Sequence, residues 1–260
     1  MDHPRTAAGI VDGDGMGKGL SVWIGVAILV ASPALAGPPY LTDDPEPTDT
    51  GHFENYLFVE GTRADEMFGS PAVGIELNYG AFADTQLTFS FPLESNPGSI
   101  GMGNVWAPLG AGVKYRFIEE DENGWRPQVA FFPSVAIPVG NAAHESPVTE
   151  LLPIWAQKSF GPDWVVFGGG GFTDNPGAGN RDFVNYGLAV QHQFTEKLAL
   201  GCEMFGQTRD SVDDAATTAV GLAGIYDLSD EWHLIGSVNT GVINHQADQF
   251  GFNLAVKWTI

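Results

Sequence analysis

Apolar and polar residues alternate along most of the chain, most clearly at its end. There, one face carries Phe250, Phe252, Leu254, Val256, Trp258 and Ile260. The other face carries Gly251, Asn253, Ala255, Lys257 and Thr259. A period of two residues is that of a β-strand, whose successive side chains point to opposite faces of the sheet. The pattern predicts a strand that runs to the last residue, with one apolar face and one small or polar face.

The same alternation recurs throughout the chain. It predicts twelve strands, over residues 51–63, 71–79, 85–93, 109–118, 126–139, 149–160, 163–173, 182–194, 198–208, 216–226, 232–243 and 249–260. Their apolar faces are rich in aromatic residues, and their other faces are small or polar. A barrel in a membrane turns its large apolar side chains outward to lipid, whereas a soluble barrel packs them inside. We therefore expect an all-β chain that forms a single transmembrane antiparallel up-and-down β-barrel of about twelve strands, with counts of ten and fourteen left open.

The connections between these strands also alternate in length. Those after even strands are short, at residues 81–84, 161–162, 195–197 and 227–231, although residues 119–124 form a longer one. Those after odd strands are longer, at residues 94–108, 140–148, 174–181 and 209–215. Bacterial barrels combine short periplasmic turns with longer outer loops, so both termini are expected in the periplasm. Pro133, Pro138 and the glycine run 168–171 are expected to weaken their strands and to mark bulges.

The N-terminus has the pattern of a secretory signal. Lys18 precedes the apolar run 20–30 (LSVWIGVAILV), and residues 34–36 (Ala-Leu-Ala) form a small-x-small cleavage site. The run is too short to span a bilayer as a helix. Three aspartates lie in the first fifteen residues, which makes Met16 the more ordinary start. We expect a signal peptide over 1–36, an N-terminal segment or plug over 37–50 and the barrel over 51–260.

Composition narrows the possible partners. The chain has 34 glycines and 11 Lys and Arg against 32 Asp and Glu, for a net charge of −21. Such a charge argues against nucleic-acid binding, which needs clustered Lys and Arg, and against a basic patch that docks on anionic lipid. Cys202 is the single cysteine, so no intrachain disulfide is possible; it falls on an apolar face, where it is expected to meet lipid.

The expected start of the mature chain resembles a known family. Residues 37–47 read GPPYLTDDPEP, and further matches are residues 51–54 (GHFE), 76–80 (ELNYG), 112–117 (GVKYRF), 155–161 (WAQKSFG) and 200–205 (LGCEMF). These stretches resemble a family of outer-membrane barrels known as transporter-like, or as proteins of the meta pathway of phenol degradation. The resemblance covers nearly the whole mature chain. It implies a barrel that takes up small, often aromatic, compounds, and it implies no catalytic residue.

Charged residues on the small or polar faces are candidates for a lumen site. These residues are Glu54, Glu76, Lys114, Arg116, Glu203 and Lys257. We expect the first three, together with Arg116 and Lys257, to form one network near the periplasmic end, with Glu203 across from it. Such ion pairs either fill and stiffen the interior or form a constriction that selects permeants by charge. Both interpretations remain open on sequence alone.

The segment that precedes the first strand is rich in proline and acid. Tyr40 to Thr50 could fold into the lumen as a plug, with Asp43, Asp44 or Glu46 meeting Lys114 or Arg116. Alternatively, the segment is a disordered periplasmic tail.

The expected function is a passive outer-membrane channel or facilitator for small molecules, hydrophobic and aromatic ones included. One alternative is a structural or surface-interaction barrel with a closed lumen. A remote alternative is a membrane-embedded hydrolase; the run His144-Glu145-Ser146 does not support it, because adjacent residues point apart. We expect no catalytic residue, no cofactor and no metal. The expected partners are outer-membrane lipid and lipopolysaccharide, the barrel-assembly machinery and a small-molecule permeant.

Overall fold

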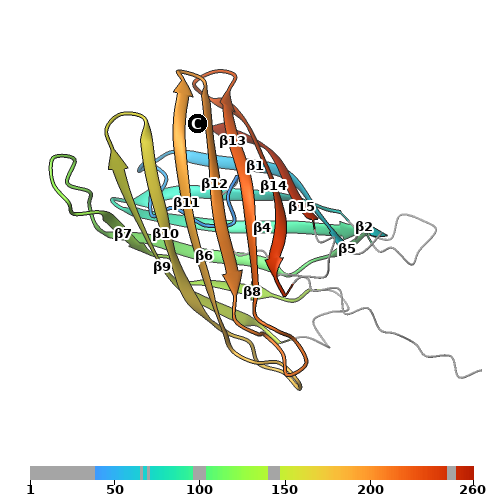
Figure 1. Cartoon of the computed structure of the whole chain (residues 1–260). Helices are drawn as coiled ribbons and strands as arrows, with labels where there is room; N and C mark the ends of the chain where they lie inside the picture. Colours follow the sequence, from blue (N-terminus) through green and yellow to red (C-terminus); the bar gives the residue numbers. More distant parts are fainter. Residues whose placement is uncertain (1–38, 65–66, 69–70, 96–103, 140–146, 245–249) are drawn as a thin grey trace, which may run out of the picture.

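In the computed structural model, the described residues form a closed antiparallel β-barrel (Figure 1). These residues are 39–64, 67–68, 71–95, 104–139, 147–244 and 250–260. The predicted signal peptide and the start at Met16 lie outside them, as does the run 144–146. Within the same ranges, no helix is long and apolar enough to cross a membrane.

Twelve strands build the wall within the described part of the chain, one of them in two pieces. The first half comprises β1 (Phe53–Ala64), β3 (Ala72–Phe82), β4 (Thr85–Ser95), β6 (Leu109–Ile118), the pieces β7 (Gln128–Phe131) and β8 (Ser134–Ile137), and β9 (Thr149–Phe160). The second half comprises β10 (Trp164–Asp174), β11 (Phe183–Thr195), β12 (Leu198–Gln207), β13 (Thr217–Asp227), β14 (Trp232–Ile243) and β15 (Phe250–Thr259). Two short strands, β2 (Met67–Phe68) and β5 (Asn104–Trp106), pair with β1 and β4. The predicted fold class and strand count are confirmed.

Pairing of the first and last strands closes the barrel. The register runs from Glu54 opposite Thr259 to Arg63 opposite Phe250. At the end of this seam, the backbones of Phe53 and Ile260 exchange two N–H···O bonds of 2.9 Å. Closure leaves no unpaired edge along the seam, which a sheet in lipid requires, since lipid offers no hydrogen bonds to the backbone.

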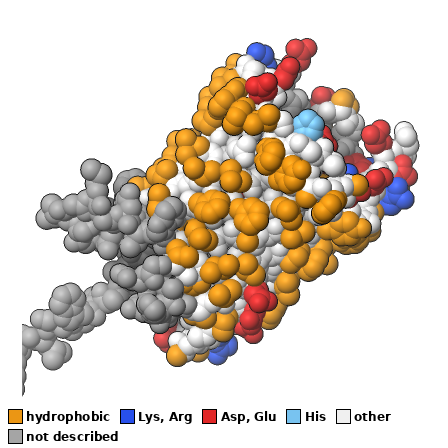
Figure 2. All heavy atoms as spheres, turned by 180° about the vertical axis from the view of Figure 1, so that it is seen from behind, with side chains coloured by type: hydrophobic (Ala, Val, Ile, Leu, Met, Phe, Trp, Pro, Cys, Tyr) orange, Lys and Arg blue, Asp and Glu red, His pale blue; other side chains and the backbone are white. Residues whose placement is uncertain are grey.

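Alternation sets the two surfaces of the wall. In β3, Glu76 and Asn78 are buried in the interior, whereas Ile75 and Leu77 are 47% and 40% exposed on the outside. Apolar side chains accordingly cover the outer face of the barrel (Figure 2). Cys202 is exposed on this outer face. An exterior of this kind matches a lipid environment.

The interruption between β7 and β8 has a local cause. Phe132 and Pro133 break the strand, and Phe132 is buried in the interior. Because Pro133 has no N–H, it cannot donate to the ladder, although its carbonyl accepts from Val113 N at 3.0 Å. The irregularity predicted at Pro133 is therefore present. The glycine run is different: β10 is continuous from Trp164 to Asp174 without a shift in register, so the bulge expected at residues 168–171 is absent.

The connections differ in length at the two ends of the barrel. The connection between β3 and β4 is the two-residue turn Ala83-Asp84, where Asp84 has a φ of 56°. Phe53 pairs with Tyr79 beside this turn, so both the start of β1 and the end of β15 lie at the short-turn end. At the same end, the longer connection after β6 is fastened to β9, because Glu120 accepts bonds from Lys158 Nζ at 2.7 Å and Ser159 N at 2.9 Å.

Candidate functional site

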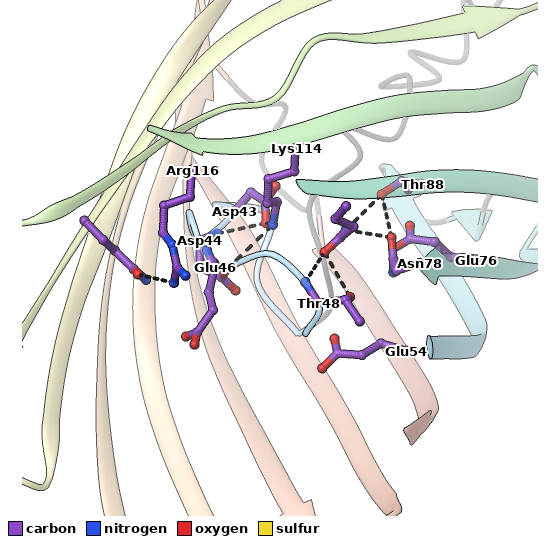
Figure 3. Close-up of polar contacts among 12 residues, drawn as sticks. Asp43, Asp44, Glu46, Thr48, Glu54, Glu76, Asn78, Thr88, Lys114 and Arg116 are labelled. Atoms are coloured by element: carbon purple, nitrogen blue, oxygen red, sulfur yellow. Dashed lines mark hydrogen bonds and ion pairs between the residues drawn. The ribbon is translucent and has the colours of Figure 1, made fainter. Parts of the chain in front are cut away.

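Residues 39–50 lie inside the barrel, and we call them the strap (Figure 3). They have no regular secondary structure apart from a bridge between Thr50 and Gly80. Thr42 and Asp43 are each only 1% exposed. The strap is the segment that the sequence offered as either a plug or a periplasmic tail, and in the structure it fills part of the lumen.

Glu203 on β12 holds the first part of the strap. Its carboxylate accepts hydrogen bonds from the backbone N–H of Leu41 at 3.0 Å and of Thr42 at 2.9 Å. The carboxylate is a charged acceptor, and hydrogen bonds to a charged group are about twice as strong as neutral ones. The sequence placed Glu203 in the lumen but gave no partner for it.

Lys114 on β6 holds the middle of the strap. Its Nζ lies 3.0 Å from Asp43 Oδ1 and 3.7 Å from Asp44 Oδ1. It also lies 5.1 Å from the centre of the Phe132 ring, a cation–π arrangement. The side chains of Lys114 and Asp43 are 5% and 1% exposed, so this ion pair is shielded from water. Removing one partner of such a pair is costly, because a buried charge then loses its compensation.

Gln86 on β4 holds the last part of the strap. Its Oε1 accepts hydrogen bonds from Thr48 N at 2.8 Å and from Thr48 Oγ1 at 3.0 Å. Its Nε2 donates to Asn78 Oδ1 at 2.8 Å and to Thr88 Oγ1 at 2.9 Å, which fixes the orientation of the amide. All four residues are buried.

The three anchors make the strap cross the lumen from wall to wall. In the strand order, five strands separate β4 from β12 in either direction when β7 and β8 count as one. Gln86 and Glu203 therefore stand on opposite walls, with Lys114 between them on the path. The strap packs toward the side that runs from β6 to β11, since Tyr40 contacts Phe167 and Thr42 lies against Gly187.

Two further ion pairs lie at the short-turn end. Arg116 donates to Asp84 Oδ1 from Nη2 at 2.6 Å and to Gln128 Oε1 from Nη1 at 3.2 Å. Lys257 Nζ lies 2.8 Å from Glu54 Oε1, across the β1–β15 seam. The charged side chains of these two pairs are 22–29% exposed, in contrast to Lys114 and Asp43.

The single lumen network expected from the sequence is divided in the structure. Arg116 pairs with the turn residue Asp84 and not with a carboxylate of the strap. Glu76 accepts from Asn78 Nδ2 at 2.9 Å, within its own strand. Glu54 pairs with Lys257 as its strand position suggested, and Lys114 meets Asp43 and Asp44. The alternation along a strand gives the face on which each residue lies but not its height along the barrel axis, so the sequence could not decide which charges meet.

The acidic strap residues differ in their surroundings. Glu46 is exposed, and in Figure 3 its side chain points away from Lys114. Although its side chain is exposed, desolvation by the surrounding protein and the nearby Asp44 raise the pKa of Glu46, and Arg116 opposes this effect. Burial also raises the pKa of Tyr40 well above its usual range, with Glu203 adding to the effect, so the phenol stays neutral. Within the described ranges, no three His, Cys, Asp or Glu side chains gather closely enough to hold a metal ion.

The lumen also has apolar surfaces that the sequence did not single out as sites. One cluster consists of Tyr40, Phe167, Ala189 and Ala223, with Val165 beside it. A second, on β1, β14 and β15, consists of Tyr56, Phe58, Ile235 and Ala255, with Ile225 beside it. The interior therefore offers both charged and apolar contacts. Aromatic residues at inward positions, such as Phe58 and Phe167, were the available signal for these clusters.

The chain matches one family model and several solved channels. The model described as "Putative MetA-pathway of phenol degradation" matches residues 40–258. An outer membrane channel from Pseudomonas putida F1 is 14% identical with a TM-score of 0.63, over 84% of this chain and 98% of that chain. The NanC porin is 9% identical with a TM-score of 0.53, over 78% and 98%. The KdgM porin in complex with disordered oligogalacturonate is 9% identical with a TM-score of 0.52, over 78% and 98%. No curated protein sequence matches.

At these identities, the solved structures establish a shared fold. The closed barrel, its apolar outer face and this shared fold place the protein in the outer membrane of a Gram-negative bacterium. The resemblance and the location expected from the sequence are confirmed.

Proposed function

The chain belongs to the family whose model spans residues 40–258, and from this membership we propose that it is a channel for passive diffusion of small molecules. One observation carries the proposal: charged side chains inside the closed wall remain open to solvent. Asp44 is 44% exposed, and Glu54 and Lys257 are 27% and 22% exposed. Charges with this exposure are accessible to water, which supports a solvated lumen beside the strap.

The lumen surfaces support small permeants that have an apolar part. The lumen face of β1, β14 and β15 combines the cluster around Phe58 and Ile235 with the pair Glu54–Lys257. A twelve-strand barrel lies between the side-chain-filled eight-strand barrels and the wide porins, and the strap narrows it further. Hydrophobic and aromatic molecules with a polar group fit such a passage. The family description, which refers to phenol degradation, points the same way, and the titles of the similar structures support a channel.

A liposome-swelling assay with aromatic acids, sugars and alkanols would test this proposal. We expect small aromatic solutes to enter faster than sugars of similar size. If no solute entered faster than it enters protein-free liposomes, the proposal would be contradicted.

The partly exposed ion pairs suggest selection by charge. Arg116→Ala removes a lumen cation and leaves Asp84 uncompensated, and Glu54→Ala removes the carboxylate that faces Lys257. If the pairs select permeants, the reversal potential in a salt gradient shifts toward cation preference in the first variant and toward anion preference in the second. Unchanged reversal potentials in both would leave these residues with the filling role alone.

A closed-lumen structural barrel is the second candidate, and the strap favours it, because anchors on opposite walls could seal the passage. Conductance separates the two functions. A channel conducts with the strap docked, whereas a sealed barrel conducts only after the strap anchors are weakened.

The arrangement of the ends supports an orientation. We propose that the short-turn end, with both strand termini, faces the periplasm and that the longer loops face outward. Lipopolysaccharide would then surround the outer half. The barrel-assembly machinery would act on the protein during insertion.

A further inference from the structure

The side chain of Tyr40 occupies a pocket in the barrel wall. Its ring lies edge-on to Phe167, with the ring centres 5.0 Å apart and the planes at 78°. Ala189 and Ala223 line the pocket and are 0% and 6% exposed, and Val165 packs beside them. Tyr40 itself is only 5% exposed, so the wall encloses an entire aromatic ring.

The pocket is shaped for the hydroxyl end of the ring as well. A Cβ at Gly201 would overlap Tyr40 Oη, and a Cβ at Gly187 would overlap the side chain of Thr42. Glycine at these two inward positions is therefore what lets the strap approach the wall. The pocket matches a flat ring with one small polar substituent, which is the shape of a simple phenol.

The pocket does not satisfy the hydroxyl group of Tyr40. Among the described residues this hydroxyl has no hydrogen-bond partner, and a buried polar group without one costs free energy. The strap is not part of the sheet at this point; its backbone bonds to the Glu203 carboxylate instead. A free phenol that enters the pocket can adjust its position to water or to the wall, which a ring fixed to the strap cannot do.

We propose that this pocket is a binding site for small phenols in the lumen, which Tyr40 occupies as a built-in ligand. A phenol that binds displaces Tyr40 and lifts this end of the strap from Gly187. The inference rests on the proposed function, because a permeant reaches the pocket only through a solvated lumen. It adds a defined site for the aromatic class of permeants, and it makes Tyr40 a competitor of the permeant.

Emptying the pocket tests the proposal. The purified full-length mature barrel in detergent is compared with Tyr40→Gly, using 4-methylphenol, which has the shape of the missing side chain. We expect saturable binding with a rise in Tm of the variant and an apparent affinity roughly tenfold or more above wild type, where Tyr40 competes. Adding Gly201→Ala to Tyr40→Gly should remove this gain. Heat-modifiable migration in gels shows that each variant folds, and Tyr40→Ala is the substitute if the glycine variant does not.

Two controls keep the outcomes distinct. Tyr186→Gly removes a tyrosine from the outer face and should bind 4-methylphenol no better than wild type. 4-Methylcyclohexanol, which is thicker than a flat ring, should not reproduce the effect. Equal binding of 4-methylphenol by wild type, Tyr40→Gly and Tyr186→Gly would overturn the proposal, as would no binding to a folded Tyr40→Gly. Liposome swelling by wild type is read separately, so a failed pocket and a failed channel give different results.

Displacement of Tyr40 can be followed in the occupied protein. With Cys202→Ala, the substitution Thr42→Cys places a single thiol beside Tyr40 that is buried while the strap is docked. We expect 4-methylphenol to accelerate its reaction with a water-soluble maleimide in a saturable way, and 4-methylcyclohexanol not to. A rate that is independent of 4-methylphenol would contradict displacement.

Discussion

Replacing Lys114 by Met would remove the ammonium that faces Asp43 while keeping an apolar stem of similar length against Phe132. Asp43 is 1% exposed, and its Oδ1 lies 3.0 Å from Lys114 Nζ. In the variant, the docked strap would keep this carboxylate buried without that cation. The strap can escape the penalty by leaving the lumen, so the substitution should act on strap docking more than on the barrel wall.

The size of the effect follows from the burial of the pair. Breaking a buried ion pair by removing one partner costs about 3–5 kcal/mol. Since about 1.4 kcal/mol is a factor of ten in an equilibrium constant, opening of the strap should become roughly a hundredfold to a few thousandfold more frequent. Adding Asp43→Asn to Lys114→Met removes the buried charge that Lys114 faced and should restore most of the docking.

The assay is maleimide labelling of Thr42→Cys in the Cys202→Ala background. Thr42 is 1% exposed, so a cysteine there reports opening, and the substitution keeps the backbone N–H that Glu203 accepts from. The labelling rate rises with the opening constant. Lys257→Met is the matched control, because Lys257 pairs with Glu54 on the wall and not with the strap. If the two variants label at the same rate, Lys114 is not an anchor and the reasoning fails.

Three further predictions use the same protein. Glu203→Gln leaves a single neutral oxygen to accept from the backbone N–H groups of Leu41 and Thr42. The cysteine at position 42 should therefore be labelled about tenfold to a hundredfold faster. An unchanged labelling rate would exclude Glu203 as an anchor. Gly80→Ala puts a methyl group against the backbone carbonyl of Asp49 and should weaken docking of the strap by about 1–3 kcal/mol. The cysteine at position 42 should then be labelled faster. Gly236 faces outward, so Gly236→Ala is the control and should leave the labelling rate at that of wild type. Burial raises the pKa of Glu120, but bonds from Lys158 and Ser159 outweigh it and lower this pKa below its usual value. These bonds to Glu120 add up to about 1 kcal/mol to the free energy of unfolding. This contribution is complete above about pH 4.3, the pKa of a glutamate in the unfolded chain, and it is lost as the pH falls through the pKa of Glu120 in the folded protein. Urea unfolding in lipid vesicles should show wild type exceeding Glu120→Gln at pH 7 and equalling it near pH 3; a constant difference would refute this.

The wall of the barrel could be predicted because alternation is a local signal. Each strand carries its own two-residue period, and the outer faces must be apolar in lipid. Even the interrupted strand around Pro133 was detectable, since a missing N–H is a property of one residue. The bulge expected at the glycine run 168–171 is absent, because these residues pair with both neighbouring strands. Backbone hydrogen bonds keep them in register without side-chain contacts.

The partners inside the lumen were harder to predict. Lys114 and Asp43 are 71 residues apart, and Glu203 and Thr42 are 161 apart, so only the closed barrel brings them together. Gln86 was not singled out, because an uncharged amide on a polar face gives no signal of an anchor. The contact between Glu76 and Asn78 could have been predicted, since residues two apart lie on the same face of a strand.

The most direct test of a solvated, conducting lumen is single-channel recording with paired cysteine variants in planar lipid bilayers. In the Cys202→Ala background, Asn253→Cys lies on the lumen face of β15 and Leu254→Cys on its outer face, where Leu254 is 56% exposed. A cationic, water-soluble thiol reagent should lower the single-channel conductance of Asn253→Cys and leave that of Leu254→Cys unchanged. Equal responses of the two variants, or no conductance steps from either protein, would contradict a conducting lumen.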